Sequence, residues 1–374
     1  MLADEKRLLS ELKIIRGLDR EAMAAALARQ DSLAKPPRSL GRLEDISVRL
    51  SGITGAVLNR ISKKRLIVLC ADNGVVAEGV ASAPQSVTKS QAINLTKGVT
   101  GAGALCRHFG AELQVVDVGI NGDVSCAEVL DRKLMRGTLN IAKEPAMTRE
   151  TAARAILTGT QLARDAGRDG VDILGVGEMG IGNTTTSAAV LRALTALPAL
   201  SLVGRGGGVD DSGFRRKLDI VSNCVEQLEV NGTDVLDVLS KVGGLDLAAM
   251  TGVFLGAALC RIPVVIDGFI SAAAALCAAR LCPNAREFMF SSHRSCEAGY
   301  SAAMAELQLA PMLDLDMRLG EGSGCPLAFE IISAAAAVMS GMASFEGAGI
   351  DDGYLEEIRQ NRRFTDGGAQ ERAK

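Results

Sequence analysis

Six short apolar runs that lack polar–apolar alternation constrain the fold of this chain more than any other feature. They are RLIVLCAD, ELQVVDVG, VDILGVGE, LSLVG, IPVVIDG and EFMFSS, each ending near Gly, Asp or Ser and followed by a segment of helical character. Strands without alternation are buried on both faces, which is typical of a parallel sheet covered by helices. The repeated order of strand, loop and helix predicts a doubly wound α/β fold with a mostly parallel sheet flanked by helices.

Helical patterns occupy both ends of the chain. Residues 1–60 are predicted to be helical with a break at Lys35-Pro36-Pro37, and LAFEIISAAAAVMSGMASF, after Met312, is helical again. Residues 361–374 form a polar tail. The N-terminus has no apolar signal core, and the nine cysteines form no CxxC pair, so we expect reduced thiols and a cytoplasmic protein.

Charge and composition exclude two classes of partner. The net charge is −3 and only 3% of the 374 residues are aromatic, which leaves neither a basic stripe for phosphates nor rings for stacking bases. The most apolar stretch, Leu245 to Leu281, is interrupted by Asp246, Arg261 and Asp267, so no uninterrupted apolar run within it reaches the roughly 20 residues of a membrane span. We therefore expect no nucleic-acid or membrane partner, and we interpret this stretch as helix, buried strand and helix.

Histidine is scarce. His108 and His293 are the two histidines of the chain, too few for a His-rich metal cage, so acid–base chemistry falls to carboxylates, Lys or Cys. His108 is interpreted as a residue near a helix C-terminus, whereas for His293 a structural and a catalytic role stay equally open. No metal and no cofactor are expected.

The segment VDILGVGEMGIGNTTT is the most informative. Gly175, Gly177 and Gly180 satisfy G-x-G-x-x-G between a strand and a helix, which favours a dinucleotide site. That site requires an acidic residue about 20 positions later for a ribose hydroxyl, yet none follows Glu178 until Asp210. A site for a single phosphate at a helix N-terminus remains, with an ordinary strand–helix turn as the alternative.

Other loops at strand ends carry polar groups. Gly206 belongs to a run of three glycines before the helix that carries Lys217, which indicates either close approach of the main chain to a ligand or a mobile loop. Ser295 lies in HRSCE, where hydroxyls and an Arg suit an anion. Glu321 lies between Gly320 and Gly322; it is either a general base or a solvated carboxylate.

Taken in order, these loops resemble one known family. The segments KPPRSLGRLEDISVRLSGI, ADNGVVAEGV, PQSVT, GEMGIGNTTTSAAV, VGRGGGVDD, RIPVVIDGFI, HRSCE and LGEGSG are similar to those of the nicotinate-nucleotide–dimethylbenzimidazole phosphoribosyltransferases of cobamide biosynthesis. The resemblance implies an α/β core at 61–325 and a smaller helical domain from both chain ends, 1–60 and 326–360. It also implies transfer of phosphoribose from nicotinate mononucleotide to an aromatic base with inversion, in a homodimer or a heterodimer with a homologous chain.

Site residues carry over by position. The resemblance implies that Glu321 is the catalytic base and that Glu178 lies beside the ribose. The implied phosphate and ribose contacts are Gly180, Ile181, Gly182, Asn183, Thr184, Gly206, Lys217 and Ser295, and the implied acceptor-base pocket comprises Asn73, Ala77, Gln85, Met179 and Leu319.

Two departures from the family pattern fall in the loop that we expect to border the acceptor. Family members commonly have His where this chain has Asn73 and an aromatic residue where it has Ala83. We therefore expect the acceptor to be dimethylbenzimidazole, another benzimidazole, a purine or a phenol. The alternatives are a less active or non-catalytic subunit of a heterodimer and a nucleotide-binding protein similar to dehydrogenases.

Overall fold

The computed structural model describes residues 3–355, so the predicted tail at 361–374 lies outside the described residues. The chain divides into two compact units. One unit combines Met1–Gly17 with Ser62–Phe329, and the other combines Leu18–Ile61 with Glu330–Lys374.

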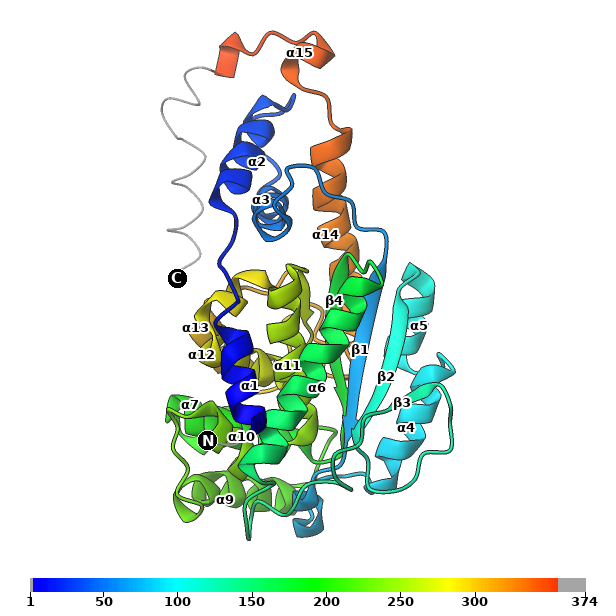
Figure 1. The fold of residues 1–374 in the computed structure, drawn as a ribbon, viewed down its shortest axis with the longest axis vertical. Helices are drawn as coiled ribbons and strands as arrows, with labels where there is room; N and C mark the ends of the chain where they lie inside the picture. Colours follow the sequence, from blue (N-terminus) through cyan, green and yellow to red (C-terminus); the bar gives the residue numbers. More distant parts are fainter. Residues whose placement is uncertain (1–2, 356–374) are drawn as a thin grey trace. The chain divides into compact units, whose positions relative to one another are not determined.

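The first unit is built on a six-stranded sheet in the order β3-β2-β1-β4-β5-β6 (Figure 1). Every neighbouring pair of strands is parallel, and the central strands are buried on both faces. The strands are β1 (Lys64–Ala71), β2 (Glu112–Gly119), β3 (Val129–Asp131), β4 (Ile173–Met179), β5 (Val264–Ile266) and β6 (Met289–Ser291). The predicted α/β class with a parallel sheet is confirmed.

One predicted strand is wrong, and one strand was missed. LSLVG is not a strand: it falls largely in the short helix α8 (Ala199–Leu202), which begins after Pro198. A run of five residues is too short to show which periodicity applies, and here Leu202 is buried whereas Leu200 is exposed. Strand β3 has three residues at the edge of the sheet and ends in the exposed Asp131, which leaves no buried run to detect.

Helices cover both faces of the sheet. In Figure 1, α4 (Ser86–Thr96) and α5 (Gly101–Phe109) lie on one side of the strands, and α6 (Arg149–Arg168) and α11 (Leu245–Cys260) lie on the other. Helices α6 and α11 are in direct backbone contact at Gly159 and Gly252. A Cβ on either glycine would lie 1.9 Å from a carbonyl oxygen of the facing helix, so no larger residue fits there. Every residue of α11 from Leu245 to Ala258 is buried, so its apolar composition is that of a core helix.

The stretch from Leu245 to Leu281 folds as predicted, into α11, β5 and α12 (Phe269–Leu281). The remaining helices of this unit are η1 (Gly74–Glu78), α7 (Asn183–Thr195), α9 (Asp211–Gln227), α10 (Val235–Val242), η2 (Pro283–Phe288) and α13 (Tyr300–Leu307).

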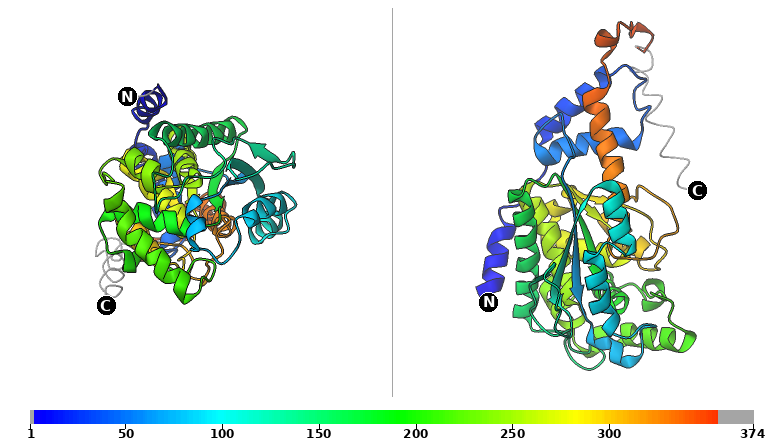
Figure 2. Two further views of the ribbon diagram at one scale, coloured as in Figure 1. Left: turned by 90° about the horizontal axis from the view of Figure 1, so that it is seen from below. Right: turned by 90° about the vertical axis from the view of Figure 1, so that its right-hand side faces the viewer.

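Helix α1 (Ala3–Leu12) belongs to the α/β unit, which differs from the expected boundary at residue 60. Figure 2 shows α1 beside α6 in both views. Leu8 and Leu12 are buried, and Glu5 and Glu11 pair with Arg149 and Arg164 of α6 at 2.7 and 3.1 Å. The apolar face and these ion pairs attach the first helix to the sheet layer.

The second unit is helical. It contains α2 (Arg20–Ser32), α3 (Arg42–Thr54), the later part of α14 (Gly324–Gly341), α15 (Phe345–Ala348) and η3 (Gly353–Leu355). Buried Lys35, at the predicted break, forms an ion pair with Glu44 of α3 at 2.8 Å. By length and composition alone α14 is able to cross a membrane, but half of that stretch is buried inside the fold, as in the core helix of a globular protein.

Candidate active site

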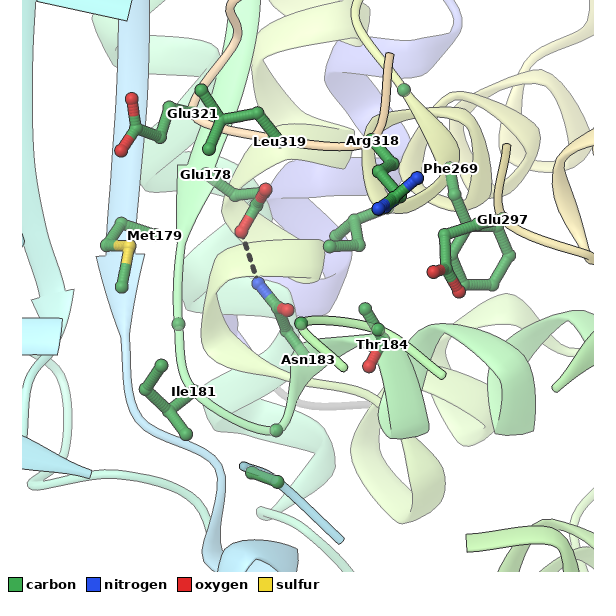
Figure 3. Close-up of a pocket in the computed structure, with 18 of the residues that line it drawn as sticks. Glu178, Met179, Ile181, Asn183, Thr184, Phe269, Glu297, Arg318, Leu319 and Glu321 are labelled. Atoms are coloured by element: carbon green, nitrogen blue, oxygen red, sulfur yellow. Dashed lines mark hydrogen bonds between the residues drawn. The ribbon is translucent and has the colours of Figure 1, made fainter. Parts of the chain in front are cut away.

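The strand order places a crevice at the carboxyl ends of β1 and β4. The chain moves outward from β1 through β2 to β3, then returns to β4 and moves in the opposite direction, so these two strands form the topological switch point. Open α/β sheets bind ligands at such points. A cavity of about 310 Å³ lies here, lined by residues 80–83, Val87 and Gln91, residues 178–184 and 205–207, residues 267–271, His293, Ser295 and Glu297, and residues 318–321 (Figure 3).

The loop after β4 leads directly into helix α7. Gly182 precedes the helix with φ 95°, and a Cβ there would lie 2.7 Å from a methyl group of Val76, so no other residue fits without strain. Thr88 Oγ1 accepts a hydrogen bond from the N–H of Ile181 at 3.1 Å and fixes the loop. The first N–H groups of α7 have no partner within the helix and, together with its dipole, they attract an anion.

A buried lysine lies behind this helix terminus. Lys217 is 1% exposed, and its Nζ donates to Thr184 Oγ1 at 2.7 Å and to the Gly204 carbonyl at 3.0 Å. Gly206, with φ 54°, lies against both side chains. Burial lowers the pKa of Lys217 to about 8. A cation, a hydroxyl and a helix N-terminus therefore converge on one wall of the cavity, an arrangement that suits a phosphate.

Two of the three glycines of the G-x-G-x-x-G pattern serve packing. Gly175 and Gly177 lie within β4 rather than in the loop. A Cβ on Gly175 would lie 2.6 Å from Cys325 Cβ, and one on Gly177 would lie 2.6 Å from the N–H nitrogen of Gly322. These positions lack a side chain because the main chain and helix of residues 321–329 press on the strand.

Glu178, the next-to-last residue of β4, lies at the base of the cavity. Its carboxylate accepts hydrogen bonds from Asn183 Nδ2 and from the main-chain N–H of Glu321, and the side chain of Asp246 is nearby. Burial, and then the charge of Asp246, raises the pKa of Glu178 to about 8. Figure 3 shows Glu178 directed toward Asn183, with Glu321 on its other side.

Glu321 occupies a left-handed turn. Gly320, Glu321 and Gly322 have φ values of 87°, 62° and 80°, and a non-glycine residue in this region costs roughly 1–2 kcal/mol. The carboxylate is 5% exposed; it accepts from Gln91 Nε2 at 3.2 Å and from the N–H of Ala102 at 3.1 Å, in the first turn of α5. The strained turn thus fixes a buried carboxylate beside the cavity.

Comparisons with known proteins agree over nearly the whole chain. A family model described as a phosphoribosyltransferase matches residues 15–350. A nicotinate-nucleotide–dimethylbenzimidazole phosphoribosyltransferase of Clostridium perfringens is 55% identical over 94% of this chain and 98% of its own length. One from Acetivibrio thermocellus is 48% identical over 92% and 98%. The crystal structure of the enzyme of that name from Thermus thermophilus has a TM-score of 0.85 at 40% identity and covers 90% of this chain and 100% of its own.

The chain belongs to the nicotinate-nucleotide–dimethylbenzimidazole phosphoribosyltransferase family. The resemblance drawn from the motifs is confirmed, and the dehydrogenase-like alternative is not supported. The sheet explains why the glycine pattern was ambiguous. Its strand order is that of dinucleotide-binding proteins, but the glycine loop follows β4, across the switch point from β1, where those proteins bind pyrophosphate.

Most of the site residues that the family resemblance implies lie around this one cavity. The cavity is lined by Glu178, Met179, Gly180, Ile181, Gly182, Asn183, Thr184, Gly206, Ser295, Leu319 and Glu321, and Lys217 lies directly behind Thr184. His293 also lines the cavity, where burial lowers its pKa to about 4.

Three residues expected in the acceptor pocket lie elsewhere. Asn73 is fully buried, and its Oδ1 accepts from Thr186 Oγ1 at 3.5 Å. Ala77 is an exposed residue of η1, and Gln85 accepts a hydrogen bond from Asn121 at 2.9 Å. The loop after β1 folds as a 3-10 turn, so the cavity receives its second half, including Ala83, rather than its first half.

Several residues that line the cavity, and Asp246 beside Asn183, were not anticipated. Gln91 follows Val87 by four positions in α4, a helical spacing that places both on the cavity side and was available in the sequence. Asp246 and Asp267 carried no such signal, because an Asp at a helix start or strand end is common in any α/β protein. In the described part of the chain, no three His, Cys, Asp or Glu side chains are grouped to hold a metal ion.

Proposed function

We propose that this chain transfers the phosphoribosyl group of nicotinate mononucleotide to the nitrogen or oxygen of an aromatic acceptor, with release of nicotinate and formation of an α-ribotide for cobamide biosynthesis. One observation carries the proposal: two buried carboxylates, Glu178 and Glu321, face the same cavity as the phosphate-type site at the start of α7. Family membership, and the names of the relatives, support the same donor and a benzimidazole acceptor.

The phosphate end of the donor is assigned to the loop before α7. We assign to it the N–H groups of Gly182 and Thr184 and the Thr184 hydroxyl, with the Lys217 charge behind them. This anchor fixes the sugar so that C1′ lies between Glu178 and Glu321. Restricting the reactants to this geometry supplies a large share of the rate enhancement.

The leaving group needs no general acid. The pyridinium ring of nicotinate mononucleotide already carries a positive charge on its nitrogen, and the electron pair of the C1′–N bond neutralises it as the bond breaks. Once ionised, above its raised pKa of about 8, Glu178 stabilises the positive charge that develops at C1′ and accepts hydrogen bonds from ribose hydroxyls.

Proton transfer is assigned to Glu321. As the nitrogen or oxygen of the acceptor attacks C1′ on the face opposite nicotinate, the acceptor's N–H or O–H proton passes to the carboxylate. Hydrogen bonds from Gln91 and Ala102 hold that carboxylate in place. Because one carboxylate suffices, the scarcity of histidine does not limit this chemistry.

The acceptor class is proposed to extend beyond dimethylbenzimidazole. Ala83 lines the cavity where family members commonly carry an aromatic residue, so a larger space is available beside the base. We also propose a homodimer and, because buried or half-buried free thiols predominate, a cytoplasmic location.

Turnover with a panel of acceptors tests the proposal. Purified protein is incubated with nicotinate mononucleotide and dimethylbenzimidazole, benzimidazole, adenine or phenol, and both products are measured by mass spectrometry. We expect nicotinate and an α-ribotide in equal amounts with at least one benzimidazole. No nicotinate release with any acceptor contradicts the proposed function.

A further inference from the structure

Asp267 is a buried carboxylate that the proposed mechanism does not yet use. It follows β5 directly and is 2% exposed. Its Oδ2 accepts from the N–H of Gly322 at 3.1 Å, and its Oδ1 accepts from the N–H of Gly324 at 2.7 Å. The N–H of Gly268 is a third main-chain donor. The carboxylate therefore binds the chain immediately after Glu321.

Within residues 3–355, no lysine or arginine forms an ion pair with this carboxylate. Its close titratable neighbour is His293, whose Nδ1 lies 3.8 Å away and whose pKa burial lowers to about 4, so the ring is neutral at pH 7. Burial raises the pKa of Asp267 to about 7, and the charge of Glu321 also raises it. Burying a carboxylate here without a cation is energetically unfavourable, and the hydrogen bonds from the main chain offset only part of that cost. This indicates that the aspartate has a role other than stabilising the fold.

The segment that Asp267 binds is the strained one. Gly320, Glu321 and Gly322 are all left-handed, and helix α14 begins two residues later at Gly324. On the opposite side the turn rests on β4, where Gly177 leaves no space for a side chain. The turn is thus held between strand β4 and the carboxylate that follows strand β5.

We propose that Asp267 is a positioning residue, whose hydrogen bonds to Gly322 and Gly324 hold the left-handed turn so that the Glu321 carboxylate faces the acceptor. This inference rests on the proposed function, in which Glu321 takes the acceptor's proton. Although Asp267 lines the cavity, its assigned effect on the chemical step operates through Glu321 and not through binding of the substrate.

Asp117 provides a control at a second buried aspartate. It is also 2% exposed, lies near the carboxyl end of β2, and accepts from the N–H groups of Gly119 and Ile120 at 3.0 and 2.8 Å. Its loop lies outside the set of described residues that line the cavity. Asp117→Asn therefore removes the charge of a buried aspartate, which also forms an ion pair with Lys133 at 3.1 Å, without touching the turn of Glu321.

The kinetic test is a double-mutant cycle. In Asp267→Asn, the amide NH₂ faces a main-chain N–H donor, so one hydrogen bond to the turn is lost and Glu321 is no longer held in place. Misplacement of a catalytic group by about 1 Å costs about 100-fold in rate. We expect kcat to fall about 30-fold to 100-fold with the KM for nicotinate mononucleotide within about 3-fold, and Asp117→Asn to change both by less than about 3-fold. In the Glu321→Gln background, Asp267→Asn should lower the residual kcat by less than about 3-fold.

Two kinetic outcomes overturn the inference. Equal losses from Asp267→Asn in the wild-type and Glu321→Gln backgrounds mean that Asp267 acts independently of Glu321. A loss confined to KM means that it binds the substrate directly. Wild-type turnover, measured first in the same assay, reports on the proposed function separately from this comparison.

Amide hydrogen exchange tests the same contact without turnover. In the wild type, the N–H groups of Gly322 and Gly324 should be as protected as those of Gly119 and Ile120. In Asp267→Asn, exchange should accelerate at least about 10-fold at residues 320–324 and remain unchanged around Gly119. Rapid exchange of Gly322 and Gly324 in the wild type contradicts the inference, whether or not the variant folds.

Discussion

Glu178 and Asp246 accept hydrogen bonds from the same nitrogen, Asn183 Nδ2. The Asp246 bond is 3.2 Å long, and Asp246 is fully buried, with its pKa raised to about 6 chiefly by burial. When two carboxylates share one amide donor, the negative charge of either one raises the pKa of the other, so ionisation of both at once is unfavourable. The charge of Glu178, beside the proposed ribose position, is therefore coupled to Asp246.

The coupling predicts a shift in pH dependence for Asp246→Asn. The pKa of Glu178 is raised to about 8 by burial first and by Asp246 second, so Glu178 is protonated below that pH. If ionised Glu178 stabilises the charge at C1′, kcat/KM rises with pH as Glu178 ionises. Removing the Asp246 charge lowers the pKa of Glu178 and moves this rise to lower pH. A pH profile of kcat/KM measures it, and a rise that stays in place contradicts the coupling.

Lys217 is predicted to act through donor affinity. Substitution Lys217→Met removes the charge behind Thr184, so we expect the KM for nicotinate mononucleotide to rise about 100-fold, with a smaller change in kcat. Because burial lowers the pKa of Lys217 to about 8, donor affinity of the wild type should also weaken above that pH. Titration calorimetry with the mononucleotide measures both effects. Lys241→Met is the control, since Lys241 pairs with Asp237 outside the cavity lining.

The glycine that precedes α7 and the glycines within β4 should have experimentally separable roles. Gly182→Ala places a Cβ at φ 95° and 2.7 Å from Val76, so the phosphate loop must move and the KM for the mononucleotide should rise at least about 10-fold. Gly175→Ala overpacks against Cys325 and should cost about 1–3 kcal/mol of stability while the KM stays unchanged. Thermal unfolding and steady-state kinetics of both variants test this division, and a raised KM in Gly175→Ala argues against it.

Acceptor range is predicted to depend on Ala83 and not on Asn73. Ala83 lines the cavity, whereas Asn73 is fully buried outside its lining. Ala83→Phe should therefore reduce kcat/KM for dimethylbenzimidazole about 10-fold relative to benzimidazole, since a ring fills space beside the base. Asn73→His should leave that ratio within about 2-fold. Competition assays with both acceptors give the ratio directly, and a larger effect from position 73 reverses the assignment.

The sequence allowed the sheet and the phosphate loop to be predicted because their signals are local. Apolar runs without alternation mark the buried strands β1, β2 and β4, and Gly182 lies in a short segment between a strand and a helix. Strand β3 and helix α8 were not predicted correctly, since three to five residues carry no distinguishable period.

Contacts between distant segments could not be predicted. Asp246 meets Glu178 through Asn183, 63 residues away, and Asp267 meets Gly324 across 57 residues. Nothing in the composition around either aspartate marks these partners. The left-handed turn at Glu321 was visible only as two flanking glycines, and its attachment to Asp267 required the folded structure.

The central claim is that Glu321 removes the acceptor's proton during phosphoribosyl transfer, and Glu321→Gln tests it most directly. The amide keeps the shape of the side chain and loses the base, so kcat should fall about 100-fold to 10,000-fold. The dissociation constant for nicotinate mononucleotide, measured by calorimetry on the same preparation, should stay within about 3-fold. Undiminished kcat, or a loss explained by weaker binding of the mononucleotide alone, would contradict the account.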